Sequence, residues 1–278
     1  MMRLEVGGRV VAEYVVAPAV DSRLSPRPYL HPVRTLSGTV VSDILPDDHP
    51  HHLGVSVAVQ DVAKNNLWGG RTYVRDTGYT WLDDHGQIVH AGFEEQAAGR
   101  LVQRLRWRAR TGATLLEERR QITATPVTGF DNAWVLGVAF DLTAPVDRDI
   151  ELGSPATNGR PGGSGYGGFF WRAPAGDVPP DVFTEAAKGE DVVNGSAEPW
   201  IAMATQRYGL VFTGLAGGDH WFVRAADYPG VCAALAYEQP LVVAAGTTVS
   251  RHHRVVVVDG RLDRAAAAKL AQQAQGHP

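Results

Sequence analysis

The sequence contains very little cysteine, since Cys232 is the only one among 278 residues. A single cysteine excludes disulfide bonds within the chain. It lies in the apolar run Val231-Cys232-Ala233-Ala234-Leu235, which has no histidine beside it. This setting predicts a buried thiol that packs as a small apolar side chain and does not act as a nucleophile.

Long apolar segments and an excess of positive charge are also lacking. No run approaches the ~20 apolar residues that a membrane-spanning helix needs, and residues 1–8 lack the apolar core of a signal peptide. The formal net charge is -4, with acidic and basic residues well mixed. No basic stripe is present that would neutralise phosphates. We therefore expect a soluble, cytoplasmic protein that binds neither membranes nor nucleic acid.

Helical periodicity is almost absent, and alternation of apolar and polar residues takes its place. Trp134, Leu136, Val138, Phe140 and Leu142 are spaced by two, which is typical of a core strand. Two strands are predicted around the Gly7-Gly8 turn in residues 3–16. Further strands are predicted at residues 55–60, 101–110, 115–124, 208–215, 219–225, 231–237 and 248–258.

These patterns predict an all-β fold in which residues 1–278 form one domain. Two large antiparallel sheets packed face to face are the simplest way for so many strands to bury their apolar sides. The strand at 115–124 is expected to carry Glu117, Glu118, Arg119 and Arg120 on a polar face. Only the end of the chain predicts a helix, at about residues 261–275, capped by Asp259 or Asp263.

The most informative segment for chemistry is Asp47-Asp48-His49-Pro50-His51-His52, with three imidazoles and two carboxylates in six residues. Histidine exchanges protons near neutrality because its unperturbed pKa is about 6.5, and its ring nitrogens bind metals. The segment lies just before the predicted strand at 55–60, a rigid position from which to present reactive groups. His252 and His253 differ from it, because consecutive residues of a strand point to opposite faces.

A glycine-rich stretch at residues 158–168 runs directly into Phe169-Phe170-Trp171-Arg172. So many glycines predict a loop, and the aromatic cluster beside it favours a functional loop over a concave site rather than a linker. No helix follows the glycines, so this is not a dinucleotide-binding motif. We expect the segment from Tyr166 to Arg172 and the loop from His49 to His52 to line one cleft.

Several segments together resemble the bacterial proteins that are commonly labelled "methane oxygenase PmoA". The segments are residues 27–35 (RPYLHPVRT), 48–54 (DHPHHLG), 66–69 (NLWG), 165–172 (GYGGFFWR), 221–224 (WFVR) and 258–260 (VDG). The label does not describe an activity of this chain, because a methane monooxygenase subunit of that name is a membrane protein and this sequence has no membrane-spanning run.

The resemblance implies a β-supersandwich similar to galactose mutarotase and a role in bacterial sugar catabolism. The chain departs from the family pattern at one place. Where many members have Asn-Gly-x-Asp-Phe-Trp, it has Asn65-Asn66-Leu67-Trp68. The acid and base of the mutarotases also cannot be placed on these residues, so mutarotation is not carried over.

A sugar site should combine aromatic platforms for C–H faces with polar groups for hydroxyls. The family segments supply both kinds of side chain. The expected platforms are Trp68, Tyr166, Trp171 and Trp221, and the expected polar groups are Arg34, Asn66, Arg172 and Arg224.

Chemistry at a sugar needs an acid and a base on opposite sides of the ring. One of His49, His51 and His52 is the expected catalyst, with Asp48, Glu117 or Glu238 as a carboxylate partner. The expected function is a sugar epimerase, lyase or hydrolase that acts on a sugar, an oxidised sugar or a glycoside.

Two alternatives remain open at the level of sequence. His49 and His51, or His51 with Asp48, could bind a divalent metal ion completed by His31, His220 or an acid from elsewhere. The chain could also be a carbohydrate-binding module without turnover, although sugar binding alone does not require several titrating groups. No other cofactor is indicated, and the oligomeric state is not determined.

Overall fold

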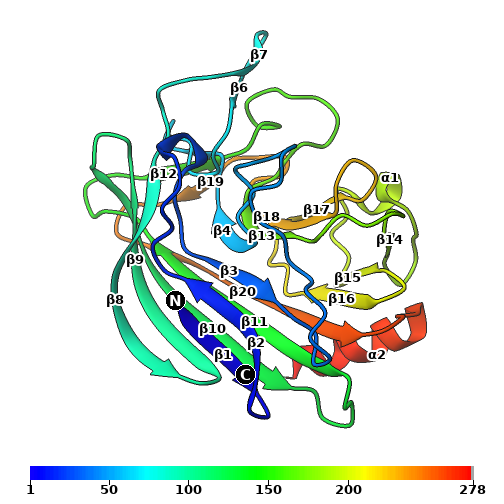
Figure 1. The fold of residues 1–278 in the computed structure, drawn as a ribbon. Helices are drawn as coiled ribbons and strands as arrows, with labels where there is room; N and C mark the ends of the chain where they lie inside the picture. The colour runs from blue at the N-terminus through cyan, green and yellow to red at the C-terminus, as the bar shows by residue number, and fades with distance from the viewer. Residues whose placement is uncertain (277–278) are drawn as a thin grey trace.

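The structure, a computed structural model, describes residues 1–276 and consists mainly of strands. Seven strands form one antiparallel sheet (Figure 1). In spatial order they are β1 (Met2–Val6), β2 (Arg9–Val15), β3 (Tyr29–Val33), β4 (Val55–Ala58), β13 (Gly168–Arg172), β18 (Gly230–Ala234) and β17 (His220–Arg224).

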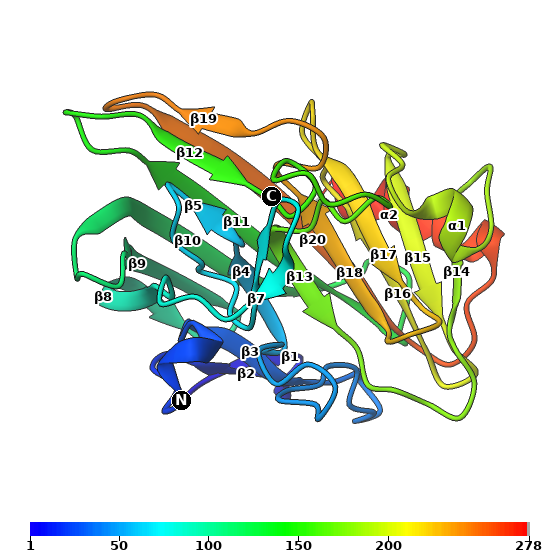
Figure 2. The same cartoon turned by 90° about the horizontal axis from the view of Figure 1, so that it is seen from above.

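A second antiparallel sheet has eight strands. In spatial order they are β14 (Asp181–Phe183), β15 (Trp200–Ala204), β16 (Tyr208–Thr213), β20 (Thr248–Asp259), β11 (Ala133–Thr143), β10 (Thr114–Pro126), β9 (Arg100–Arg108) and β8 (Gln87–Ala97). The two sheets pack on each other (Figure 2), and the predicted all-β sandwich is confirmed.

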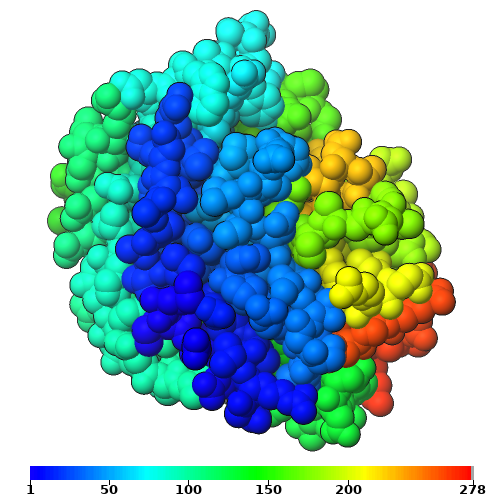
Figure 3. Space-filling model, viewed as in Figure 1, coloured from blue at the N-terminus to red at the C-terminus, as the bar shows by residue number. Residues whose placement is uncertain are grey.

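Two small sheets lie at one end of the sandwich. One contains β19 (Leu241–Val243), β12 (Ile150–Gly153) and β5 (Asp61–Val62), and the other is the hairpin of β6 (Thr72–Val74) and β7 (Gly78–Thr80). The hairpin projects from the body of the molecule in Figure 1. In the space-filling view the N-terminal residues, in blue, lie between the cyan-to-green and the yellow-to-red parts of the chain (Figure 3).

Alternation along the strands of the seven-stranded sheet separates two apolar clusters. Phe169 and Trp171 of β13 point into the core between the sheets, whereas Phe170 belongs to a cluster on the opposite face. Trp221 and Phe222 of β17 divide in the same way. The outer face of this sheet is therefore apolar and aromatic, and loops must cover it to keep it from water.

The helical prediction is also confirmed. Helix α2 (Arg264–Gln275) begins after Asp263, whose side chain accepts a hydrogen bond from the amide of Ala266 at 2.8 Å. Its buried face packs on the outside of β16 and β20. The other helices, η1 (Ser22–Leu24) and α1 (Glu190–Val193), are too short to produce a periodic pattern. None of the helices in residues 1–276 is long and apolar enough to cross a membrane.

Two side chains of β10 correct the expectation of a polar outer face. Glu117 and Arg119 are exposed as expected, but Glu118 and Arg120 are only 2% exposed and face the sandwich interior. Their charges pair there, with Arg120 Nε donating to Glu118 Oε1 at 2.6 Å. The thiol of Cys232 is buried, as predicted.

Candidate functional site

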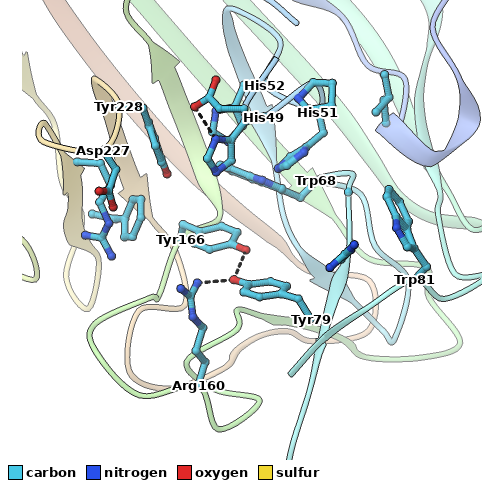
Figure 4. Close-up of a pocket in the computed structure, with 17 residues that line it drawn as sticks. His49, His51, His52, Trp68, Tyr79, Trp81, Arg160, Tyr166, Asp227 and Tyr228 are labelled. Atoms are coloured by element: carbon cyan, nitrogen blue, oxygen red, sulfur yellow. Dashed lines mark hydrogen bonds and ion pairs between the residues drawn. The ribbon is translucent and has the colours of Figure 1, made fainter. Parts of the chain in front are cut away.

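A pocket of about 680 Å³ lies on the outer face of the seven-stranded sheet (Figure 4). Three segments contribute to it: the loop of residues 47–52 (the histidine loop), the glycine-rich loop of residues 158–168, and the β6–β7 hairpin. The lining residues are Leu24, Asp48, His49, Pro50, His51, His52, Trp68, Gly70, Arg71, Tyr79, Trp81, Arg160, Tyr166, Phe222, Arg224, Asp227 and Tyr228. The structure thus places the two segments that were expected to share a cleft at one pocket.

Backbone hydrogen bonds close the histidine loop. The amide of Leu45 donates to the carbonyl of His52, and the amide of His52 donates to the carbonyl of His49, both at 2.9 Å. The buried guanidinium of Arg27 ties this loop to its neighbour, because it donates to the carbonyls of His51 and Trp68, each at 2.9 Å. The loop is therefore held from inside the protein, and its imidazoles have fixed positions.

His49 is the histidine of the loop that is bonded to a carboxylate. Its Nδ1 lies 2.7 Å from Asp48 Oδ2, and Arg172 donates to both oxygens of Asp48 at 3.1 and 3.2 Å. Burial would raise the pKa of Asp48, but the hydrogen bonds from His49 and Arg172 outweigh it and lower that pKa. Asp48 is therefore an anion that orients the His49 ring and leaves Nε2 for a ligand.

His51 and His52 lie deeper and are neutral. Burial, with the nearby positive charge of Arg27, lowers the pKa of His51 to about 3. Burial and the neighbouring histidines lower the pKa of His52 well below its usual value. His52 stacks on His49 with ring centroids 4.6 Å apart and meets Phe170 at 4.8 Å. Its ring packs as part of the pocket floor and supports His49 from behind.

The loop that follows β5 positions the aromatic platform Trp68. Asn66 is fully buried, and its Oδ1 accepts from the amides of Trp68 and Gly69 at 2.9 and 2.8 Å. Gly69 and Gly70 have φ values of +97° and +72°, and a Cβ on Gly70 would lie 2.7 Å from His51 Nδ1. Glycine is required here because the backbone passes directly against the imidazole.

Three side chains opposite the histidine loop form a hydrogen-bonded chain (Figure 4). The hydroxyls of Tyr79 and Tyr166 lie 2.8 Å apart, and Arg160 Nη1 donates to the Tyr79 hydroxyl. The guanidinium of Arg160 also lies over the Tyr79 ring, 4.8 Å from its centroid. Burial raises the pKa of both tyrosines, so their hydroxyls are protonated and can donate.

The remaining walls combine aromatic rings with charges. Trp81 is 49% exposed at the rim, and the guanidinium of Arg71 lies 6.0 Å from its ring centroid. The guanidinium of Arg224 lies 4.3 Å from the ring centroid of Phe222, and that of Arg172 lies 4.6 Å from the ring centroid of Tyr228. Burial raises the pKa of Tyr228 as well.

Several of the expected site residues lie outside the pocket, among them Trp221, Arg34 and Glu238. Trp221 is in the sandwich core, because the alternation of β17 points its neighbours Phe222 and Arg224 to the pocket instead. The side chain of Arg34 is bonded to the carbonyl of Gly38 in its own turn. Glu238 is exposed to solvent and does not line the pocket.

Other expected residues act from behind the wall or elsewhere. Asn66 and Arg172 do not line the pocket, but they hold Trp68 and Asp48, which do. Trp171 packs in the sandwich core. Glu117 is exposed and accepts from Arg106 at 3.1 Å, far from any histidine of the loop.

The side chains that were expected as metal ligands have other partners in the structure. The ring centroids of His49 and His51 are 5.7 Å apart in an edge-on arrangement, and His49 Nδ1 is engaged by Asp48. His31 bonds Ser42 and His220 stacks on Tyr237, so neither completes a set with them. Within residues 1–276, no group of three or more His, Cys, Asp or Glu side chains is placed to hold a metal ion.

The sequence interpretation missed Tyr79, Arg160, Arg71, Trp81 and Tyr228. Arg160 lies within the glycine-rich loop that was expected to be functional, but its partner Tyr79 is 81 residues away in the chain. The Tyr-rich hairpin gave a local signal, since Tyr73 and Tyr79 are cross-strand partners with rings 5.5 Å apart. No local pattern indicates that the hairpin folds over the histidine loop.

The family model of DUF6807, described as a family of unknown function, matches residues 1–272. The chain belongs to the DUF6807 family. A search among curated proteins gives no match. The match covers every segment that builds the pocket, so the pocket belongs to the part of the chain that defines the family.

Two solved structures overlap this DUF6807 protein at low sequence identity. A heparan sulfate lyase, HepC, from Pedobacter heparinus overlaps 64% of the chain with 8% identity and a TM-score of 0.30. A protein from the human microbiome described as a kojibiose phosphorylase overlaps 94% of the chain with 9% identity and a TM-score of 0.35. The chain spans 22% and 28% of their lengths. Scores this low do not establish a common fold with either protein.

Proposed function

We propose that this DUF6807 protein is a cytoplasmic carbohydrate-active enzyme of bacterial sugar catabolism, with the pocket as its active site. The observation that carries the proposal is the His49–Asp48–Arg172 chain at an aromatic pocket, opposite the Tyr79–Tyr166 hydroxyl pair. A proton acceptor and proton donors thus flank one cavity. This is the arrangement that acid–base chemistry on a small molecule needs.

The size and lining of the pocket support a sugar as the ligand. A volume of about 680 Å³ suits one or two sugar rings, since ligand pockets measure roughly 300–1,000 Å³. Trp68, Tyr166 and Trp81 offer flat faces for C–H groups, and Arg160 and Arg224 offer donors for oxygen atoms.

In the proposed mechanism, His49 removes or delivers a proton at the sugar through Nε2. Asp48 holds the ring by its other nitrogen, and Arg172 holds Asp48. Across the pocket, Tyr79 or Tyr166 donates to an oxygen of the substrate, because burial keeps both hydroxyls protonated. Removal of the proton beside a sugar carbonyl and return of a proton to the opposite face give epimerisation, and its removal with loss of a β-oxygen substituent, protonated by the tyrosine, gives elimination. In hydrolysis of a glycoside, His49 would activate a water molecule and the tyrosine would protonate the leaving oxygen.

The test is a screen of unmodified sugars, oxidised sugars and glycosides with the wild type and the His49→Ala, His51→Ala and His52→Ala variants. Positioned acid–base catalysis contributes about 10²–10⁴-fold, so His49→Ala should lower turnover by that factor and change binding much less. Circular dichroism spectra of the variants control for misfolding. Sugar binding without turnover in the wild type would contradict the proposal and favour a recognition module.

A chelator arm of the same screen separates the metal-dependent alternative. Loss of turnover on chelation and its recovery with a divalent ion would make His49 and His51 metal ligands instead of acid–base groups. Turnover that is unchanged by chelation supports His49 as the proton carrier.

A further inference from the structure

The charges around the pocket are unbalanced. Arg71, Arg160 and Arg224 line it, and Arg27 lies beneath His51. In the part of the chain that the structure describes, residues 1–276, no carboxylate forms an ion pair with Arg27, Arg71 or Arg160. By contrast, Arg172 has Asp48 at 3.1 Å and Arg224 has Glu190 at 3.7 Å.

Arg27 is the most unusual of these groups. Its side chain is fully buried, and its guanidinium bonds only neutral acceptors, among them Ser56 Oγ at 3.2 Å and the carbonyls of Ser25, Trp68 and His51. Burial lowers its pKa to about 9, which still leaves it charged at neutral pH. A buried charge without an opposite charge is costly to fold around, so a positive field lies under the pocket.

Arg71 and Arg160 lie at the side of the pocket beside the β6–β7 hairpin, which we call the hairpin wall. The acidic side chains of the pocket do not offset their positive charge there. Asp48 is engaged by Arg172 and His49. Asp227 lies beside Tyr228, on the side of the pocket away from Trp81 (Figure 4). Arg224, on that same side, has Glu190 at 3.7 Å. Among the lining residues, the carboxylates are therefore Asp48 and Asp227, and the charged side chains beside the β6–β7 hairpin are Arg71 and Arg160.

Aromatic rings hold the two arginines of the hairpin wall. Arg160 lies over Tyr79 and donates to its hydroxyl, and Arg71 lies against Trp81. Contact with a ring face orients a guanidinium while its N–H groups remain free to donate along the edge. Such preorganised forks match the paired oxygens of a carboxylate or a phosphate.

We infer that the substrate is an anionic sugar, whose carboxylate or phosphate group is bound by Arg71 and Arg160 at the hairpin wall. The inference rests on the proposed function, because it names the class of sugar that the same pocket takes. The sugar ring then packs against the Trp68 and Tyr166 side chains, whose ring centroids are 4.8 Å apart, with its reacting carbon toward His49. The positive field of Arg27 favours the anion from below.

The test is calorimetric titration with three matched series. Each series contains the neutral hexose, its uronate and its 6-phosphate, for glucose, galactose and mannose. The wild type should bind the anionic members of at least one series more tightly than the neutral hexose. Whether the uronate or the phosphate binds more tightly identifies the anionic group. The preference should weaken with added salt, because salt screens charges at a half-open site.

Arginine variants locate the binding group. Arg71→Gln and Arg160→Gln should each weaken binding of the anionic sugar about tenfold to a hundredfold, the effect of losing a charge-assisted hydrogen bond, and reduce its preference over the neutral hexose by the same factor. Arg75→Gln is the matched control. Arg75 is exposed on the same hairpin but lines a separate cavity of about 280 Å³, so binding should not change.

The outcomes of this test differ from those of the proposed function. Equal binding of neutral and anionic sugars, unaffected by Arg71→Gln and Arg160→Gln, would overturn the inference and leave the proposed sugar enzyme intact. Failure of every sugar to bind the wild type would count against both. An anion preference that Arg75→Gln abolishes as strongly as Arg71→Gln would also overturn the assignment to this wall.

Discussion

Charged side chains are buried in two regions, the sandwich interior and the layer beneath the pocket. The charges are paired in the first region and unpaired in the second. In the interior, Arg120 bonds Glu118 at 2.6 and 2.9 Å, and Trp107 Nε1 donates to the second oxygen of Glu118. Beneath the pocket, Arg27 is equally buried but bonds only neutral oxygens. The interior charges are paired with each other, whereas the charge beneath the pocket has no opposite charge bonded to it.

This difference separates polar groups that serve the fold from those that serve the site. A paired charge in a dry interior contributes little net stability but becomes very costly if its partner is removed. An unpaired charge under a pocket already costs stability, and its field acts on whatever enters. Substitutions in the two regions should therefore fail in different ways.

The largest effect is expected for Arg120→Met in the interior. The substitution leaves Glu118 charged and buried without its partner, which should reduce the free energy of unfolding by about 3–5 kcal/mol. Urea denaturation measures this loss. Arg119→Met is the control, because Arg119 is exposed, pairs with Glu94 and should cost less than about 1 kcal/mol. Similar losses in both variants would show that the interior pair is no more important than a surface pair.

A smaller effect on stability, with a larger one on activity, is expected for Gly70→Ala. The added Cβ would meet the His51 ring at 2.7 Å, so the imidazole or the loop must shift. Positive φ adds strain of about 1–3 kcal/mol. A displacement near 1 Å in a catalytic loop can cost about 10²-fold in rate, and steady-state kinetics should detect that loss.

Gly78→Ala separates strain from displacement. Gly78 also has positive φ, +90°, but no atom lies within 4 Å of its added Cβ. It should lose similar stability and keep most of its activity. Equal loss of activity in both variants would mean that backbone strain, and not contact with His51, is responsible.

The smallest and most gradual effect is expected from pH. Burial lowers the pKa of His253 in the interior and of His51 in the pocket, each to about 3, so both are neutral in the folded protein. In the unfolded chain they take up protons at about pH 6.5. Above pH ~6.5 both imidazoles are neutral in the folded and the unfolded protein, so their burial adds no pH dependence there. The free energy of unfolding falls as the pH decreases from ~6.5 toward ~3.

Phenylalanine variants sharpen the comparison between the two histidines. His253→Phe and His51→Phe should each make the free energy of unfolding less dependent on pH between ~6.5 and ~4. His253 stacks on Phe169 in the core, so His253→Phe should leave ligand binding unchanged, whereas His51→Phe should disturb it. Urea titrations at several pH values measure the slope. An unchanged slope in both variants would contradict the assignment of neutral, buried imidazoles.

Local patterns predicted most of the fold and part of the site. Alternation identified the core strand at Trp134–Leu142, and apolar residues recurring every four positions identified the final helix. Of the two expected caps, Asp259 and Asp263, the structure uses Asp263. The same alternation cannot tell which of two faces becomes a pocket, since both faces of β17 are buried. Trp221 was therefore placed in the site and Phe222 was not.

Long-range contacts account for the remaining errors. Tyr79 and Arg160 meet because the β6–β7 hairpin folds toward the glycine-rich loop, and no residue near either one signals this. Arg172 was expected to touch the substrate, but its strand position turns it toward Asp48 behind the wall. The residue types indicated which chemistry the site could perform. Only the folded structure shows which of these residues line the pocket and which lie behind its wall.

Deuterium exchange tests the central claim, that His49 carries protons at this pocket, most directly. Sugars from the screen are incubated in D₂O with the wild type or with His49→Gln, and deuterium at carbon positions is followed by NMR. Epimerisation removes a proton from carbon and returns one from solvent, so it should incorporate deuterium in the presence of the wild type. Elimination incorporates deuterium when a deuteron returns to the carbanion before the leaving group departs. The account predicts incorporation by the wild type and at least about 10²-fold slower incorporation by a folded His49→Gln variant that still binds the sugar. Equal incorporation rates in the two proteins would contradict it.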